Sequence, residues 1–188
     1  DLDNILRGSA IEKSISNGLA DGKFEVYYQP TYTIDGRRLH GAEALVRLHD
    51  DEMGMLFPDE FIPVAENIGL IDAIDDFVLM DVCKTIKEEK LDEIVDCINV
   101  NLSVIQLMKP DFVEHVNGLV EMTGVDKKFI NFEVTESISS ENYEIMNNAI
   151  NNLKKEGFQF SLDDDGTGYS NMKALASMNL DCIKIDKS

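Results

Sequence analysis

The sequence FQFSLDDDGTGYS, residues 158–170, is the stretch around which the chain is organised. Apolar residues alternate in its first half, a pattern that predicts a buried strand over residues 158–163. Three adjacent carboxylates follow and repel one another, and two glycines permit the positive φ angles of a tight turn. A hard divalent cation, which prefers oxygen ligands, would neutralise these acids. A solvated acidic turn is the simpler interpretation of this stretch taken alone.

The composition indicates one globular domain with a strongly acidic surface. The chain has 188 residues, 44% of them hydrophobic, and a formal net charge of −19. This charge repels nucleic acid polymers and anionic membranes, so a phosphate ligand would need bound cations to attract it. No apolar run is long enough to span a bilayer, and no signal peptide is evident. We therefore expect a cytoplasmic protein, or the cytoplasmic domain of a larger, membrane-associated one.

The three cysteines, Cys83, Cys97 and Cys182, are odd in number and lie far apart in apolar segments. This arrangement predicts buried, reduced thiols and no disulfide framework. None has a neighbouring Cys or His at zinc spacing. The three histidines are scattered as well, and we expect them to be surface or packing residues.

Strands and helices alternate along most of the chain, after a polar helical linker over residues 1–22. Asp35-Gly36 predicts a hairpin, so the first two strands are antiparallel. The later alternation predicts parallel βαβ units in an α/β domain over residues 23–188, either a doubly wound sheet or a β/α barrel. The predicted strands cover residues 24–30, 39–47, 95–103, 129–135, 158–163 and 180–186; the predicted helices cover residues 1–23, 58–69, 71–90, 104–122 with a break at Lys109-Pro110, 142–156 and 170–178.

Polar residues gather at the carboxyl-terminal portions of these strands. In parallel sheets these ends emerge on one side, where the active sites of barrels lie. The oxygen donors among them predict a site for Mg²⁺ or Mn²⁺, with Ca²⁺ in a less reactive geometry, and such a set can hold two metals for phosphoester hydrolysis. The predicted ligands are Glu43, Asn101, Glu133, Asp163 and Asp164.

Three further residues complete the predicted site. Lys184 could position water or neutralise developing charge, and Arg47 suits phosphate through its planar fork. Gln29, at the end of the first strand, could donate to a base or a phosphate. Structural roles remain open for two of them: Arg47 could pair with Glu43, and Lys184 with Asp163 or Asp186.

The sequence resembles the EAL-domain phosphodiesterases of bacterial cyclic di-GMP signalling. The tripeptide Glu43-Ala44-Leu45 stands within GAEALVR, and an ordered series of further motifs extends over nearly the whole chain. These motifs are YQP at 28–30, FIPVAE at 61–66, NVNLS at 99–103, EVTES at 133–137, DDDGTGYS at 163–170 and IKIDKS at 183–188.

The resemblance implies a modified TIM-type (β/α) barrel with an antiparallel first strand and hydrolysis of cyclic di-GMP to linear pGpG. It implies two Mg²⁺ or Mn²⁺ ions and inhibition by Ca²⁺. Glu43, Asn101, Glu133 and Asp163 correspond to ligands of the first metal, and Asp164 helps bridge to the second. Catalysis is assigned to Lys184, Asp164 and Glu43, with Lys184 holding the catalytic water. Gln29 and Arg47 correspond to substrate contacts.

The resemblance also implies regulation and a larger assembly. Glu136 corresponds to the residue that anchors the loop at residues 164–170, which is coupled to a homodimer in the family. Asp165 stands where the family usually has Phe, which alters loop packing. The family continues for two βα units beyond the position of Ser188, so we expect an incomplete barrel with little activity of its own and additional domains in the full-length protein. The alternative function is a catalytically impaired cyclic di-GMP sensor or an interaction domain.

Overall fold

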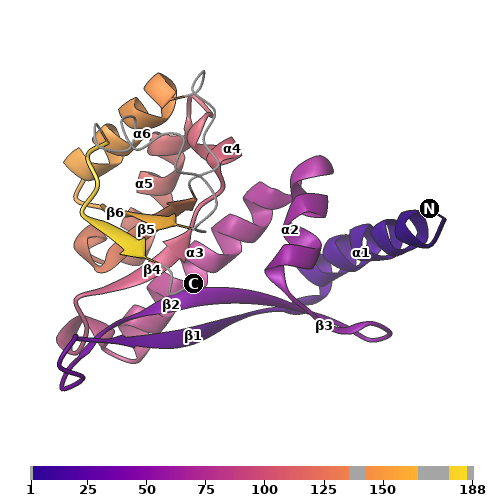
Figure 1. Ribbon diagram of the computed structural model, residues 1–188, viewed down its shortest axis with the longest axis horizontal. Helices are drawn as coiled ribbons and strands as arrows, with labels where there is room; N and C mark the ends of the chain where they lie inside the picture. The colour runs from indigo at the N-terminus through magenta and orange to yellow at the C-terminus, as the bar shows by residue number, and fades with distance from the viewer. Residues whose placement is uncertain (1, 136–142, 165–177, 186–188) are drawn as a thin grey trace.

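The computed structural model describes residues 2–135, 143–164 and 178–185. Within these ranges the chain forms one seven-stranded sheet covered by helices, which confirms the predicted α/β class (Figure 1). The predictions for Glu136, Asp165 and Asp186 lie outside the described residues. So does nearly all of the helix predicted over residues 170–178.

The antiparallel start of the sheet follows from its turn. β1 (Phe24–Tyr32) pairs with β2 (Leu39–Asp50), and Gly36 between them has a φ of 65°. The Asp35 carboxylate accepts hydrogen bonds from the Thr33 hydroxyl at 2.6 Å and from the Arg37 backbone at 3.2 Å. A further short strand, β3 (Gly54–Leu56), pairs with the end of β2 and was not predicted.

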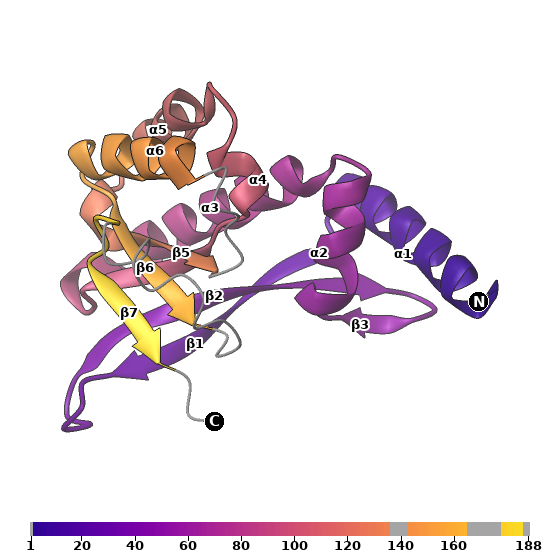
Figure 2. The ribbon, with the colours of Figure 1, turned by 45° about the horizontal axis from the view of Figure 1, so that its top comes forward.

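The remaining strands are parallel and follow the chain in order. They are β4 (Cys97–Asn101), β5 (Ile130–Thr135), β6 (Gln159–Asp164) and β7 (Cys182–Ile185). The strand order is β1-β2-β4-β5-β6-β7, with β3 attached to β2. In the described part of the chain β1 and β7 do not pair with each other, so the sheet curves but stays open (Figure 2). The prediction of an incomplete barrel with an antiparallel first strand is therefore confirmed.

Proline and glycine mark the boundaries of several helices. Pro58 opens α2, and Gly124, with a φ of 68°, closes α5. The predicted break at Lys109-Pro110 separates α4 from α5. The helical segments are α1 (Leu2–Asp21), α2 (Pro58–Asn67), α3 (Ile71–Glu88), η1 (Leu91–Glu93), α4 (Val104–Leu107), α5 (Phe112–Thr123), η2 (Lys127–Phe129) and α6 (Tyr143–Lys155).

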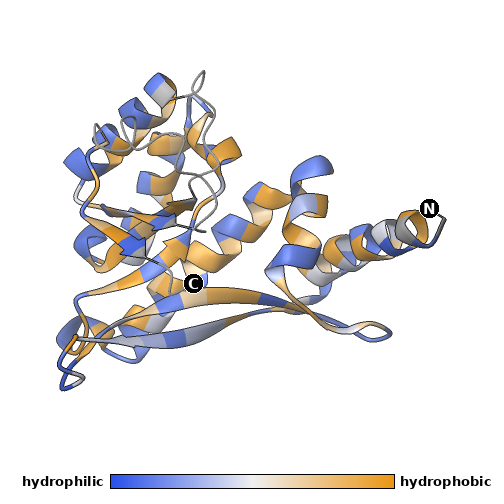
Figure 3. Ribbon diagram, in the orientation of Figure 1, coloured by the Kyte–Doolittle hydropathy of each residue, from blue (hydrophilic) through white to orange (hydrophobic). Residues whose placement is uncertain are grey.

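Two hydrophobic cores hold these elements together, and the apolar faces of the helices turn toward them (Figure 3). The large core joins α3, α5 and α6 to the parallel strands through residues such as Val82, Phe132 and Phe160. The small core joins α1, α2 and the start of α3 to β2 and β3 through residues such as Ile15 and Phe61. Val46 and Phe77 pack against both cores, so they mark the boundary between them.

Successive side chains of the parallel strands point to opposite faces of the sheet, one apolar and one polar. In β5, Ile130, Phe132 and Val134 are buried against the helices, whereas Asn131 and Glu133 lie on the opposite face. The parallel strands are therefore not continuous apolar runs, because their second face is polar. A polar interior of this kind carries a site, because buried polar groups need partners.

The cysteine prediction holds for two thiols and fails for the third. Cys83 and Cys97 are buried, and burial raises the pKa of Cys97 to about 11. Cys182 is exposed, because β7 is an edge strand that pairs with β6 on one side and with no described strand on the other.

Candidate functional site

Four predicted site residues from four strands meet around one ammonium group. Lys184 Nζ on β7 lies 2.6 Å from Glu133 Oε2 on β5 and 3.1 Å from Glu43 Oε2 on β2. The second oxygen of Glu133 is 2.5 Å from the same nitrogen, an ionic contact without hydrogen-bond geometry. Asn101 on β4 donates to Glu43 Oε1 at 3.0 Å. The four side chains form one connected polar cluster on the interior face of the sheet.

Glu133 is the buried centre of this cluster. Its side chain has no exposed surface, whereas those of Lys184 and Glu43 retain 28% and 22%. Burial raises the pKa of Glu133 to about 7, the Lys184 ammonium opposes this effect, and the carboxylates of Glu43 and Asp163 add to it. A carboxyl group whose pKa is perturbed by burial and specific charges is typical of functional sites.

A layer of amides and a hydroxyl supports the cluster from below. Asn131 donates to Asn99 Oδ1 at 3.1 Å and also to the Ser161 hydroxyl. Asn131 and Ser161 are 5% and 2% exposed, so these hydrogen bonds satisfy groups that water cannot reach. Sequence analysis missed the role of Asn131, although its position two residues before Glu133 places it on the same strand face.

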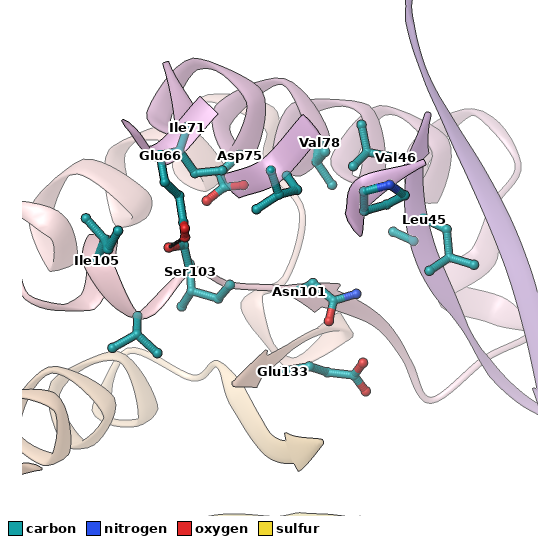
Figure 4. Close-up of a pocket in the computed structure, with 15 residues that line it drawn as sticks. Leu45, Val46, Glu66, Ile71, Asp75, Val78, Asn101, Ser103, Ile105 and Glu133 are labelled. Carbon is teal, nitrogen blue, oxygen red and sulfur yellow. Dashed lines mark hydrogen bonds between the residues drawn. The ribbon is translucent and has the colours of Figure 1, made fainter. Parts of the chain in front are cut away.

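A cavity of about 530 Å³ opens beside the cluster, between the sheet and the helices α2 and α3. Figure 4 shows Asn101 and Glu133 on one side of it, with Asp75 and Val78 of α3 on the other. Leu45 and Val46 of β2 also line the cavity. The volume and the mixture of apolar walls with a few polar groups fit a small-molecule site.

Acidic residues that sequence analysis did not select face this cavity from the helices. Ser103 donates to Glu66 Oε1 at 2.8 Å, which ties α2 to the end of β4. Asp75 Oδ2 is buried and has no hydrogen-bond partner among the described residues. Burial raises the pKa of Asp75 well above its usual range, and the nearby carboxylates of Asp72, Asp76 and Glu66 raise it further. Asp75 lies within α3, and the apolar periodicity of α3 predicts only a packed helix. It therefore did not mark Asp75 as a site residue.

The two predicted substrate contacts lie apart from the four-residue cluster. Gln29 is exposed on β1, directly opposite Glu43 in the β1–β2 register, so both side chains share a face. Arg47 lies four residues beyond Glu43 on β2, and its guanidinium donates to the Val46 carbonyl at 2.8 Å. In the described structure Glu43 is engaged by Asn101 and Lys184, so the alternative of an Arg47–Glu43 pair is not supported.

The residues present suit a hard cation in chemistry, although the described residues do not form a complete metal site. Glu43, Asn101 and Glu133 supply carboxylate and amide oxygens around one positive charge, the ammonium of Lys184. Asp163 is paired with Lys184 in the β6–β7 register, and Asp164 ends β6. No group of three or more His, Cys, Asp or Glu side chains in the described ranges could hold a metal ion. The metal assignment stays a prediction.

This fold and this cluster define a class: an open β/α barrel with an acidic site on the interior face of its parallel strands. Residues 12–188 match the EAL domain family, so the chain belongs to that family. In the described ranges no helix combines the length and the apolar character needed to cross a membrane.

Its relatives include long signalling proteins. The chain is 33% identical over 184 residues to the cyclic di-GMP phosphodiesterase NbdA of Pseudomonas aeruginosa, covering 95% of this chain and 23% of that protein. It is 33% identical over 187 residues to the oxygen sensor protein DosP of Escherichia coli, covering 99% of this chain and 23% of that protein. The chain thus spans about a quarter of the length of these curated relatives.

Solved EAL structures share the fold. The PaMucR phosphodiesterase in complex with c-di-GMP superposes with a TM-score of 0.85 at 27% identity, over 94% of this chain and 72% of that one. The EAL enzyme Bd1971, in its form bound to cAMP and cyclic di-GMP, also gives a TM-score of 0.85 at 27% identity, over 97% of this chain and 51% of that one.

Proposed function

We propose that this chain is a phosphodiesterase domain that hydrolyses cyclic di-GMP to linear pGpG with Mg²⁺ or Mn²⁺ as cofactor. The observation that carries the proposal is the convergence of Glu43, Asn101, Glu133 and Lys184 beside a cavity of about 530 Å³. Membership of the EAL family and the phosphodiesterase names of its relatives support the same activity.

The donor set accounts for the proposed cofactor. The residues that would hold two ions are Glu43, Asn101, Glu133, Asp163 and Asp164, and the ions would polarise a phosphate oxygen and activate water. Arg47 would bind a phosphate, and Gln29 would donate to a base or a phosphate. A homodimer and a cytoplasmic location remain predictions.

Lys184 has a defined place in this chemistry. Its ammonium already lies within 3.1 Å of two carboxylates, so it can hydrogen-bond a water molecule at the same point. During hydrolysis the oxygen of that water bonds to phosphorus, one ester P–O bond breaks, and the departing 3′ oxygen gains a proton. The positive charge of Lys184 would stabilise the negative charge that develops on the phosphate.

Turnover is the direct test. Cyclic di-GMP incubated with the chain and Mn²⁺ should yield pGpG, measured by chromatography, and Glu43→Ala should lower the rate by roughly 10²-fold or more. Glu121→Ala is the control, because Glu121 is exposed on α5 and pairs with Lys127. Ca²⁺ in place of Mn²⁺ should suppress turnover. Equal rates for the wild type and Glu43→Ala would contradict the proposal.

A sensor that binds cyclic di-GMP without turnover is the second candidate. Lys184 already pairs with Glu43 and Glu133, and the described residues contain no group of three acidic, His or Cys side chains able to hold a metal. Binding of cyclic di-GMP by calorimetry without pGpG formation would favour this function. Absence of both binding and turnover would exclude both candidates.

Metal binding can be tested without activity. Mg²⁺ or Mn²⁺ should raise the melting temperature, because the unfolded chain lacks the assembled carboxylates. The shift should shrink in the Glu133→Gln variant, which removes the negative charge of the central carboxylate. An equal shift in the wild type and in this variant would place the ions elsewhere.

A further inference from the structure

The helix α2 begins with a residue that is unsuited to its position. Phe57 is the N-cap, where Ser, Thr, Asp or Asn would accept a hydrogen bond from the first turn. Phenylalanine has no acceptor, and Phe57 makes no side-chain cap hydrogen bond. Its ring is not buried in exchange, because 47% of the residue is exposed. Neither capping nor core packing therefore explains an aromatic ring here.

The ring of Phe57 instead contacts the guanidinium of Arg47. Arg47 Cζ lies 4.9 Å from the centroid of the Phe57 ring and 6.0 Å from that of Tyr27 on β1. Both distances are within the range of cation–π attraction. Among the described residues Arg47 has no carboxylate partner, so its charge is held by aromatic faces and stays available to an anion.

The pair formed by Arg47 and Phe57 lies at the rim of the cavity. Leu45 and Val46, which immediately precede Arg47 in β2, line the cavity, and so does Pro58, which follows Phe57. Arg47 thus stands next to the lining of the cavity, four residues along β2 from Glu43. A ligand with two phosphates and two bases could contact both Arg47 and the polar cluster.

A second set of contacts fixes Phe57 from the N-terminal helix. Glu60 Oε2 accepts a hydrogen bond from the Phe57 backbone N–H at 3.1 Å. Its other oxygen pairs with Arg7 Nη2 of α1 at 2.5 Å. Glu60 therefore joins α1 to the first turn of α2, and the carboxylate holds the backbone that carries the Phe57 ring.

From these contacts we infer that Phe57 is a positioning residue that holds the Arg47 guanidinium at the cavity rim for a phosphate of the ligand, and that Arg7 fixes Phe57 through Glu60. The inference rests on the proposed function for the identity of the ligand, cyclic di-GMP. An exposed phenylalanine is often only a scattered surface residue. The unused N-cap position and the cation–π geometry are two separate observations against that explanation here.

The ligand-free protein gives the first test. A guanidinium over an aromatic face is shielded by the ring current, so the Nε proton of Arg47 should resonate upfield of the other arginines in an NMR spectrum, with Arg47→Lys used for assignment. Phe57→Leu, which keeps apolar bulk but removes the π face, should move this resonance downfield, whereas Phe57→Tyr should preserve it. Tyr32→Leu is the matched control, because Tyr32 is an exposed aromatic residue at the far end of β1. An Arg47 resonance that does not respond to Phe57→Leu overturns the inference whatever the ligand is.

Binding gives the second test. Phe57→Leu should weaken cyclic di-GMP binding roughly three- to tenfold, as expected for loss of one cation–π contact, with an unchanged melting temperature. In an Arg47→Ala background Phe57→Leu should have no further effect, because the group that it positions is gone. Additive losses in this double-mutant cycle would overturn the positioning role. Absence of binding by the wild type would instead contradict the proposed function, and the NMR result would still decide the role of Phe57.

The contact with α1 is tested by reversing its charges. Arg7→Glu alone should weaken cyclic di-GMP binding and shift the Arg47 resonance in the same direction as Phe57→Leu does. The exchange Arg7→Glu with Glu60→Arg should restore the ion pair between α1 and α2 but not the acceptor for the Phe57 N–H, so recovery should be partial. Wild-type binding and an unshifted Arg47 resonance in Arg7→Glu would overturn the part of the inference that concerns α1.

Discussion

Two clusters of charged side chains differ in burial. One lies at the amino ends of the neighbouring strands β2 and β4, and the other lies farther along the sheet. At the amino end, Arg38 donates to both oxygens of Asp96 at 2.9 and 2.6 Å, and His40 lies 2.7 Å from the same carboxylate. Toward the carboxyl end, Lys184 contacts Glu133 and Glu43 at comparable distances. Asp96 and its partners are about half exposed, whereas the Glu133 side chain is fully buried.

Burial, more than the nearby cations, makes the pKa values of the Asp96 and Glu133 carboxylates differ. Hydrogen bonds from Arg38 and His40 lower the pKa of Asp96 to about 2, because no desolvation of similar size opposes them. Burial raises the pKa of Glu133 to about 7 although Lys184 is as close. The exposed ion pair is satisfied in the folded protein, whereas the buried one holds a charge that a ligand could stabilise further.

Removal of the cation from the buried cluster should have the largest effect. Lys184→Met leaves Glu133 and Glu43 without their cation, and we expect a loss of about 3 kcal/mol in the free energy of unfolding at pH 8. Urea denaturation measures this loss. Adding Glu133→Gln should recover part of it, because the unpaired buried charge is then absent. Arg38→Met is the matched control at the exposed end and should cost far less, because solvent screens an exposed pair. An equal loss in both variants would remove the distinction between the two ends.

The amino end should be more sensitive to backbone packing than to charge. Gly41 on β2 faces Cys97 on β4, and a Cβ atom at Gly41 would lie 2.2 Å from the Cys97 carbonyl oxygen. Gly41→Ala should therefore destabilise the protein by about 2 kcal/mol, since two backbones must separate. Gly8→Ala, where an added Cβ meets nothing within 4 Å, is the control. Thermal unfolding followed by circular dichroism compares the two, and similar melting temperatures would show that β2 and β4 can separate freely.

Asp75 extends the comparison to a buried acid for which the described residues supply no cation partner. Its raised pKa means that the folded state keeps a proton that the unfolded state releases, so stability is greatest below the unfolded pKa and falls as the pH rises through the folded pKa. Asp75→Asn should remove this loss, so the variant should gain more stability relative to the wild type at pH 8 than at pH 4. Urea denaturation at both pH values measures the difference. A gain that is the same at both would show that the carboxyl group does not titrate as proposed.

The exposed carboxylate should give the smallest effect. Because the pKa of Asp96 is lowered to about 2, its contribution is present above the unfolded pKa and is lost as the pH falls through about 2. Asp96→Asn should slightly lower the melting temperature at pH 7, and the difference from the wild type should vanish near pH 2. A melting temperature that falls as far as in Lys184→Met would mean that exposure does not weaken this pair.

Sequence patterns predicted most of the fold because the residues that begin and end its helices and turns act locally. Asp35-Gly36 predicted the antiparallel hairpin, and Pro58 and Pro110 predicted helix boundaries. β3 escaped prediction because three residues are too few for a periodic signal, and its strand follows a turn in which Asp50 accepts the backbone N–H groups of Glu52 and Met53.

The site was predicted in part. Glu43, Asn101, Glu133 and Lys184 were selected because each stands at the end of a strand, and parallel strands bring such positions together. The contact partners were not predictable, because pairing of Lys184 with Glu133 depends on the curvature of the sheet. Asp75 and Phe57 were missed because both belong to helix segments whose approach to the sheet only the tertiary structure defines.

The division of the interior into two cores has a consequence for motion. The cavity takes Ile62 and Ile71 from the side of the small core and Ala44, Val78 and Leu102 from the side of the large one. Its walls thus belong to two cores, which are joined by the packing around Val46 and Phe77 and by the continuous elements α3 and β2. Each unit can open with its own free energy, so amide hydrogen exchange should resolve two foldons, with α1 and α2 exchanging before β4 and β5. A ligand in the cavity would contact both foldons at once and should slow the exchange of α1 and α2 most.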